Sequence, residues 1–332
     1  MIPLLVCDDS TMARKQLIRA LPAEWPVRIT QASHGEEALD AIRQGLGRVV
    51  LLDLTMPVMD GYQVLAQLRA EGLAAQVVVV SGDVQDEAQR RVRELGALAF
   101  IRKPADPEEL RATLLGLGLL APVPAGVPAT PGPLPELKVN FRDALREVSN
   151  VAMGRAAALL ARVLGVFVRL PIPNVSLFEV SELQMALADA QRGERLSAVC
   201  QGFIGEGIAG EALLLFHDTE SAEVARLMDV TPRGDTDQAE MLLDLAGILI
   251  GACLAGFAEQ LDIRFSQSHP RLLGQHSSVE RLLNLNTRRW HKTLAVEISY
   301  EIEDRELHFD LLLLFTESSV ARLTQKIHYL MD

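Results

Sequence analysis

Short apolar runs alternate with longer amphipathic stretches over the first 118 residues of the chain. The runs IPLLVC, VRIT, RVVLL, QVVVV and ALAFI predict strands, and the stretches that follow them predict helices over 11–21, 35–44, 61–71, 84–95 and 107–117. Val, Ile and Leu fill these runs without polar alternation, which is typical of strands buried on both faces. The pattern predicts an α/β fold for residues 1–118, a doubly wound, flavodoxin-like domain with a five-stranded parallel sheet.

The prolines divide the chain. Six of the sixteen lie between residues 122 and 135. Each proline lacks an amide donor and fixes φ, so this stretch can sustain neither a helix nor a central strand. We therefore expect an extended, semi-rigid linker over 119–137 and a second domain over 138–332.

The second part of the chain contains a quasi-repeat. Residues 143–150 and 240–247 each open a long helical stretch rich in Ala and Leu, 97 positions apart. The segments 211–227 and 310–327 each read as a strand followed by a helix, and their strands lie 99 positions apart. Each half thus has both a matching helical stretch and a matching strand-helix segment. A chance similarity between helices rich in Ala and Leu is therefore the weaker explanation. We expect a pseudo-two-fold α/β domain with an antiparallel sheet.

The amino-acid composition disfavours several classes of function. With 32 Lys and Arg against 44 Asp and Glu, the net charge is −12, which disfavours binding of nucleic acid through its phosphates. The three cysteines show no pair with the spacing of a zinc site, and the seven histidines show neither His-x3-His nor HExxH spacing. No apolar run reaches about 18 residues, and the N-terminus has no basic region before its acids. We expect a cytoplasmic protein without a membrane partner.

Polar residues follow four of the five predicted strands of the first domain. Asp8 and Asp9 follow the first, Asp53 the third, Ser81 the fourth and Lys103 the fifth. In a doubly wound sheet these strand ends meet at one edge. Three converging carboxylates repel one another unless a cation such as Mg²⁺ binds them. Metal and ammonium together favour a phosphoryl group, with an aspartate as its nucleophile.

At these positions the segment resembles the response-regulator receiver family, through the motifs VCDDS, LLDLTMPVMDG, VVVVSG and FIRKP. The resemblance implies that a sensor histidine kinase phosphorylates Asp53. It also implies that Mg²⁺ is bound directly by Asp9, Asp53 and the Thr55 carbonyl, and through water by Asp8. Ser81 matches the switch hydroxyl, Lys103 the phosphate-pairing lysine and Phe100 the aromatic switch. Packing in the hydrophobic core, without a switch role, explains Phe100 equally well.

One helix of the second domain carries a polar motif. Asp143, Glu147 and Asn150 share a helix face, which on its own favours a solvated face beside a packing stripe. With Pro173, they form the pattern D-x3-E-x2-N-x22-P, which resembles the CheC/CheX/FliY family of chemotaxis phosphatases. The resemblance implies that Asn150 orients a water for attack on an aspartyl phosphate, and that Glu147 pairs with the lysine of a receiver.

The second copy of the motif departs from the pattern. Glu240, Asp244 and Gly247 stand at its matching positions, followed by Pro270. Gly247 has no side chain to orient a water, so we expect this copy to be catalytically silent, with a residual binding role for Asp244 left open.

These features predict a response regulator whose C-terminal domain is an aspartyl-phosphate phosphatase. Its substrate is a receiver, either its own or that of a partner. The alternative is a non-enzymatic adaptor whose C-terminal domain binds partners under the control of Asp53 phosphorylation. A homodimer is compatible with either function.

Overall fold

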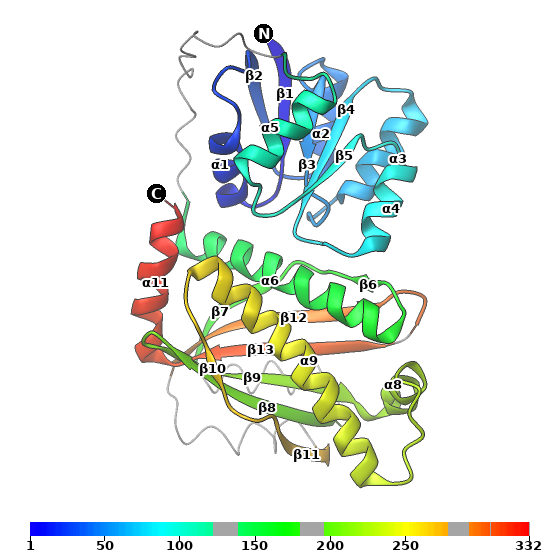
Figure 1. Cartoon of the computed structure of the whole chain (residues 1–332), viewed down its shortest axis with the longest axis vertical. Coiled ribbons are helices and arrows are strands. Elements are labelled where there is room, and N and C mark those ends of the chain that lie inside the picture. The colour runs from blue at the N-terminus through cyan, green and yellow to red at the C-terminus, as the bar shows by residue number, and fades with distance from the viewer. Residues whose placement is uncertain (122–138, 180–195, 278–291, 306, 332) are drawn as a thin grey trace. The chain divides into compact units, whose positions relative to one another are not determined.

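The computed structural model describes residues 1–121, 139–179, 196–277, 292–305 and 307–331 (Figure 1). The chain forms two compact units, residues 1–147 and 148–332. The proline-rich segment predicted as a linker lies almost wholly outside the described residues.

The first unit contains a five-stranded sheet in the order β2-β1-β3-β4-β5, with every neighbouring pair parallel. This is the flavodoxin-like order of a doubly wound fold, and it confirms the predicted class. The strands lie close to the predicted apolar runs. They are β1 (Ile2–Cys7), β2 (Val27–Ala32), β3 (Val49–Leu52), β4 (Gln76–Ser81) and β5 (Ala99–Arg102).

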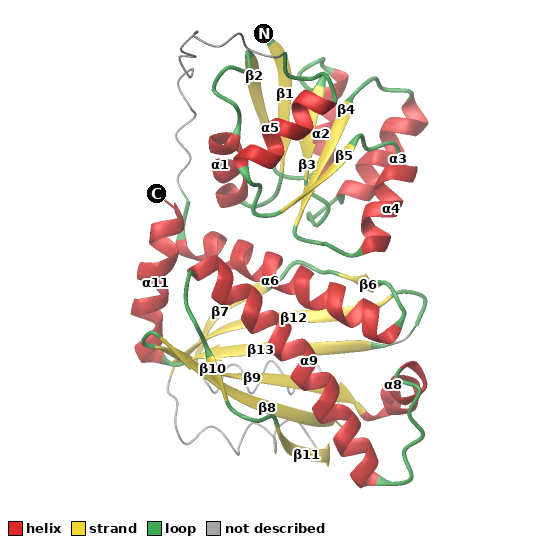
Figure 2. Cartoon of the chain, viewed as in Figure 1, coloured by secondary structure: helices red, strands yellow, loops and turns green. Residues whose placement is uncertain are grey.

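Helices cover both faces of this sheet (Figure 2). Alternate strand residues point to opposite faces, so Leu4 and Leu51 pack with α1 and α5, whereas Leu5 and Leu52 pack with α2, α3 and α4. Burial on both faces explains why these strands show no polar alternation. The helices are α1 (Thr11–Ala20), α2 (Gly35–Arg43), α3 (Gly61–Glu71), α4 (Asp86–Glu94) and α5 (Pro107–Gly116).

The second unit contains an eight-stranded sheet whose main path is β10-β8-β9-β13-β12-β6. β11 pairs with β8 and β7 with β12, and all described pairings are antiparallel, as predicted. The strands are β6 (Val168–Arg169), β7 (Asn174–Glu179), β8 (Leu196–Gly205), β9 (Ile208–His217), β10 (Ser266–Gln267), β11 (Arg271–Ser277), β12 (Lys292–Ile302) and β13 (His308–Phe315).

The strand register supports the predicted two-fold repeat. Leu213 of β9 lies opposite Leu312 of β13, and these residues are themselves 99 positions apart. Phe216 pairs with Phe309, and its repeat equivalent Phe315 pairs with Gly210. The pseudo-two-fold axis therefore passes between the two central strands. Each half also places one strand at the far edge of the other half, β7 beside β12 and β11 beside β8.

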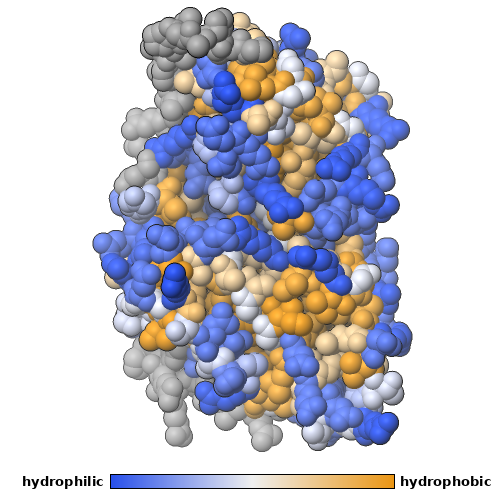
Figure 3. All heavy atoms as spheres, viewed as in Figure 1, coloured by the Kyte–Doolittle hydropathy of each residue, from blue (hydrophilic) through white to orange (hydrophobic). Residues whose placement is uncertain are grey.

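Helices line one face of this second sheet (Figure 1). The long helix α9 is apolar and long enough to cross a membrane by length and composition, yet 56% of its most apolar window is buried inside the structure. Its buried residues include Leu245, Leu249 and Phe257, as expected of a core helix. The helical elements are α6 (Phe141–Leu164), the short 3₁₀ turn η1 (Asp218–Glu220), α8 (Ser221–Leu227), α9 (Asp235–Leu261) and α11 (Glu317–Met331). On the face viewed in Figure 3, hydrophilic side chains are interspersed with apolar ones over both units.

Helices α6 and α9 approach closely at a glycine. A Cβ added at Gly256 would lie 2.7 Å from the Ala152 Cα, whereas one added at Gly251 would meet nothing nearer than the Gln267 Oε1 at 3.9 Å. Alanine is favoured over glycine in a helix by about 1 kcal/mol, but overpacking costs about 1–3 kcal/mol. The two glycines of the same helix should therefore respond oppositely to substitution.

We expect Gly251→Ala to raise the free energy of unfolding of the second unit by up to about 1 kcal/mol. Gly256→Ala should lower it by about 1–3 kcal/mol, because the added methyl forces the α6 backbone to move. Thermal unfolding followed by circular dichroism and calorimetry compares the two variants. Equal shifts of the same sign would show that α6 does not constrain position 256.

Candidate functional site

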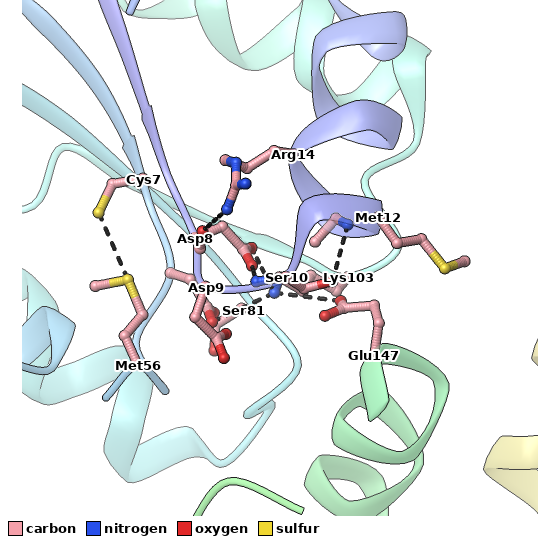
Figure 4. A network of polar contacts seen from close by, with 12 residues as sticks. Cys7, Asp8, Asp9, Ser10, Met12, Arg14, Met56, Ser81, Lys103 and Glu147 are labelled. Atoms are coloured by element: carbon pink, nitrogen blue, oxygen red, sulfur yellow. Dashed lines mark hydrogen bonds and ion pairs between the residues drawn. The ribbon is translucent and has the colours of Figure 1, made fainter. Parts of the chain in front are cut away.

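The polar residues predicted at the strand ends lie together in the first unit (Figure 4). The Lys103 Nζ lies 2.6 Å from the Asp8 Oδ2 and 3.3 Å from the Asp53 Oδ2. Asp8, Asp9 and Asp53 each contribute one carboxylate oxygen to a cluster, and these three oxygens all lie within 4.8 Å of one another. Three carboxylates and one ammonium therefore converge at this edge, as the order of strand ends predicts.

The backbone holds Asp53 in place. The Asp53 amide donates to the Cys7 carbonyl, which ties the end of β3 to the end of β1. A Cβ at Gly61 would lie 2.3 Å from the Asp53 carbonyl oxygen, so only glycine lets the loop after β3 return to α3 so closely. Thr55 lies half-buried in that loop.

Ser81 and Phe100 come from the neighbouring strands. Ser81 ends β4, is fully buried, and its Oγ accepts a hydrogen bond from the Asp83 amide. Phe100 lies in β5 and is half-buried against the core beneath α2, α3 and α4. Its packing agrees with the core alternative and leaves the switch role a prediction.

The first turns of α6 also belong to the first unit and bring three side chains to this edge. The Asn140 Oδ1 accepts from the Asp143 amide and caps the helix. The Asp143 carboxylate accepts from the amides of Thr11 and Met12, at the start of α1. The Arg146 Nη2 lies 3.2 Å from the Asp9 Oδ2.

Glu147 completes the cluster. Its Oε1 lies 3.2 Å from the Lys103 Nζ, and its side chain is 5% exposed. Figure 4 shows Glu147 projecting from α6 toward Lys103. One buried ammonium therefore contacts three carboxylates, those of Asp8, Asp53 and Glu147.

Burial and mutual repulsion raise the pKa of three carboxyl groups, those of Asp9, Asp53 and Glu147. The pKa of Asp9 rises to about 6, first through burial and then through the charge of Asp8, against the attraction of Arg146. Burial raises the pKa of Glu147 to about 7 and that of Asp53 well above its usual range, although Lys103 opposes both shifts. Burial works to lower the pKa of Lys103, but the surrounding carboxylates outweigh it and raise that pKa.

The acidic residues fit a hard divalent cation. The Asp53 Oδ1 is buried and accepts no hydrogen bond from the described residues, whereas the Asp53 Oδ2 and the Asp9 Oδ2 have only the ion-pair contacts with Lys103 and Arg146. Buried polar atoms without partners are rare, and a bound ion is one explanation for them. All the nearby ligand atoms are carboxylate oxygens, which Mg²⁺ prefers.

Mg²⁺ binding should weaken in acid. Mg²⁺ needs an ionised Asp9, whose pKa of about 6 means that protons compete with the metal below this pH. We expect the affinity to fall as the pH drops, with a loss of about tenfold per unit from Asp9 well below pH 6. Isothermal titration of Mg²⁺ between pH 5 and 8 measures this. A flat affinity down to pH 5 would contradict the assignment of Asp9 as a ligand.

Nothing in the sequence indicates the contacts that Asp143 and Arg146 make in this cluster. The Asp143 bonds to the start of α1 and the approach of Arg146 to Asp9 join residues more than a hundred positions apart. The spacing of the polar motif identified only the shared helix face. A basic residue next to Glu147 looks like an ordinary exposed helix position.

The remaining predicted residues belong to the second unit. Asn150 lies in α6 one turn beyond Glu147. Asp244 is exposed on α9, and Gly247 is half-buried there. A Cβ at Gly247 would have only the Pro270 Cγ within reach, at 4.0 Å, so packing does not require a glycine at this position.

Comparison with known proteins supports the interpretation of the first unit. Residues 4–115 match the family model described as the response regulator receiver domain. A protein-glutamate methylesterase/protein-glutamine glutaminase from Rhodopseudomonas palustris is 32% identical over 158 residues, covering 47% of this chain and 43% of that protein. The response regulator Rre1 of Synechocystis is 31% identical over 118 residues, covering 35% and 51%. The chain thus spans about half the length, or less, of these curated relatives.

Solved structures are similar to parts of the chain. The receiver domain of NarL from Mycobacterium tuberculosis is 31% identical, with a TM-score of 0.33, and covers 35% of this chain and 94% of that one. FliY from Thermotoga maritima is 20% identical, with a TM-score of 0.42, and covers 57% and 94%. The family match, the sheet order and the acidic cluster with its lysine agree with one another for the first unit. Residues 4–115 of this chain are a response regulator receiver domain.

Proposed function

We propose that this protein is a response regulator phosphorylated on Asp53, and that its C-terminal domain hydrolyses aspartyl phosphate on receiver domains. The proposed domain boundaries are those predicted from the sequence. They give a receiver over 1–118, a linker over 119–137 and a phosphatase domain over 138–332. The observation that carries the proposal is the contact of Glu147 with Lys103, because it joins a residue of the polar motif to the lysine of the receiver site within the first unit.

The nucleophile for phosphorylation is the Asp53 carboxylate. It is fully buried, and the Lys103 ammonium lies 3.3 Å from one of its oxygens. An ammonium at this distance neutralises a phosphoryl oxygen, and the Ser81 hydroxyl can donate to another. Mg²⁺ would be held directly by Asp9, Asp53 and the Thr55 carbonyl and through water by Asp8, and it would supply further charge neutralisation. A histidine kinase is the phosphodonor that a receiver domain implies.

Hydrolysis requires a water in line with the bond from phosphorus to the Asp53 oxygen. Asn150 follows Glu147 by three residues in α6, so both side chains lie on one face of the helix. Glu147 holds Lys103, and the Asn150 amide, which both donates and accepts, orients the water. The water oxygen attacks phosphorus, the bond to Asp53 breaks, and inorganic phosphate leaves with Asp53 restored as a carboxylate. Positioning supplies much of the catalysis in phosphoryl transfer.

Steady-state phosphate release tests this proposal. The full chain, Mg²⁺ and an excess of a small acyl-phosphate donor should release inorganic phosphate continuously, because each cycle phosphorylates and then hydrolyses Asp53. Asn150→Ala should release phosphate at the slow rate of uncatalysed hydrolysis. Equal steady rates for the two proteins, on their own receiver and on free receivers added as substrate, would contradict the phosphatase and leave the C-terminal domain as a binding module switched by Asp53.

Mixing two variants separates action within a chain from action between chains. Asp53→Ala chains keep Asn150 and cannot be phosphorylated, whereas labelled Asn150→Ala chains carry phosphate that they do not hydrolyse. Acceleration of label loss on mixing would show action between molecules. No acceleration, together with fast loss from the wild-type chain, would restrict hydrolysis to a chain's own receiver.

A further inference from the structure

The second unit carries a cluster of metal-binding side chains remote in sequence from the receiver motifs. We propose that His217, His308 and Asp310 form a site for a divalent transition-metal ion of the zinc class. Each residue offers one ligand atom, and these atoms all lie within 4.8 Å of one another. This proposal does not depend on the phosphatase activity.

The pairing of β9 with β13 brings the three residues of this cluster together. Phe216 of β9 pairs with Phe309 of β13 in the antiparallel ladder, so His217 and His308 occupy the next cross-strand position. Their ring centroids are 4.3 Å apart. Asp310 follows His308 by two residues, so its side chain points to the same face of the sheet. Three ligands therefore meet on one face at the end of the two central strands.

The donor set differs in kind from that of the receiver. Two imidazoles and one carboxylate favour zinc and related transition metals, whereas Mg²⁺ prefers oxygen alone. Three protein ligands also match zinc sites that leave a fourth position for water or another ligand. The His308 side chain is 41% exposed, so solvent reaches the site.

Neighbouring residues orient two of the three ligands. The His308 Nδ1 lies 2.9 Å from the Glu220 Oε1, and the Glu220 side chain is 10% exposed. This contact occupies Nδ1 and leaves Nε2 as the metal-binding nitrogen, as in the carboxylate–histidine–metal arrangement of many zinc sites. The Ser299 hydroxyl donates to the Asp310 Oδ1 over 2.6 Å, which fixes that carboxylate and leaves Oδ2 for the ion.

Cobalt substitution tests the site. The full chain in excess Mg²⁺, which occupies the receiver, is titrated with Co²⁺ while the visible absorption of tetrahedral cobalt is followed. We expect one saturable equivalent per chain, displaced by Zn²⁺. His217→Ala and His308→Ala should abolish the signal. His269→Ala, which removes an exposed histidine of the same unit, should leave it unchanged.

Glu220→Gln provides a sharper variant, because Glu220 acts on the metal only through His308. We expect its Co²⁺ and Zn²⁺ affinities to fall about 10–100-fold. X-ray absorption of the wild-type chain with one equivalent of Zn²⁺ needs no variant and should show scattering from two imidazoles. The proposal is overturned by the absence of saturable binding, by binding that persists in both histidine variants, or by a zinc spectrum without imidazole scattering.

Discussion

Asp53→Asn is expected to abolish phosphorylation of the chain. The variant should take up no acid-stable, base-labile phosphate from a small acyl-phosphate donor, because an amide cannot replace the carboxylate as the nucleophile. The same substitution should stabilise the fold at neutral pH. Burial raises the pKa of Asp53, so its ionised form costs stability that is absent in acid and grows as the pH rises through that pKa.

The two effects together distinguish lost chemistry from lost structure. Labelling is measured with a radioactive donor, and stability by thermal unfolding at pH 7.5 and at pH 5, where the stabilisation should shrink. Asp60→Asn is the matched control. Asp60 caps α3 in the same loop, and asparagine is an equally good cap. Labelling of Asp53→Asn at the wild-type level would place the phosphoacceptor elsewhere.

Lys103→Met is expected to destabilise the receiver strongly at neutral pH. The Lys103 ammonium is the cation that contacts the buried carboxylates of Asp8, Asp53 and Glu147, and methionine removes the charge while keeping most of the volume. Removing one partner of a buried ion pair costs about 3–5 kcal/mol. The raised pKa of Glu147, about 7, means that protonation relieves part of this cost, so the loss should diminish as the pH falls below 7.

Chemical denaturation of Lys103→Met between pH 5 and 8 measures this effect. Mg²⁺ should restore part of the stability, because it supplies positive charge to the same carboxylates. Arg102→Met, at the exposed neighbouring position of β5, is the control and should change the free energy of unfolding by less than about 0.5 kcal/mol. A small, pH-independent effect of Lys103→Met would contradict a buried charge cluster at this edge.

The sequence predicted the receiver sheet and the convergence of the polar residues at its strand ends, because both follow from local patterns in the chain. Runs such as QVVVV are buried on both faces and therefore carry no polar alternation, and a parallel sheet brings the ends of its strands together. Asp8, Asp53 and Lys103 could thus be placed near one another before any distance was known. The predicted repeat, whose strands lie 99 positions apart, agrees with the pairing of Leu213 with Leu312.

Contacts that depend on packing between distant segments were not predictable. Nothing in the sequence near Arg146 indicates that it approaches Asp9. The histidines showed no metal-binding spacing because His217 and His308 come from two strands that meet only in the folded sheet. Spacing rules detect ligands on one helix or one loop, whereas cross-strand ligands require the register.

The lifetime of the phosphoryl group on Asp53 tests the central claim most directly. The full chain is labelled, the donor is removed, and the loss of phosphate is followed for the wild type, Asn150→Ala and Asp244→Asn, the last from the degenerate second motif. Loss of one positioning group costs about 100-fold, so we expect Asn150→Ala to hold its phosphate about 100 times longer than the wild type. Asp244→Asn should decay like the wild type. Identical lifetimes for the wild type and Asn150→Ala would contradict the account.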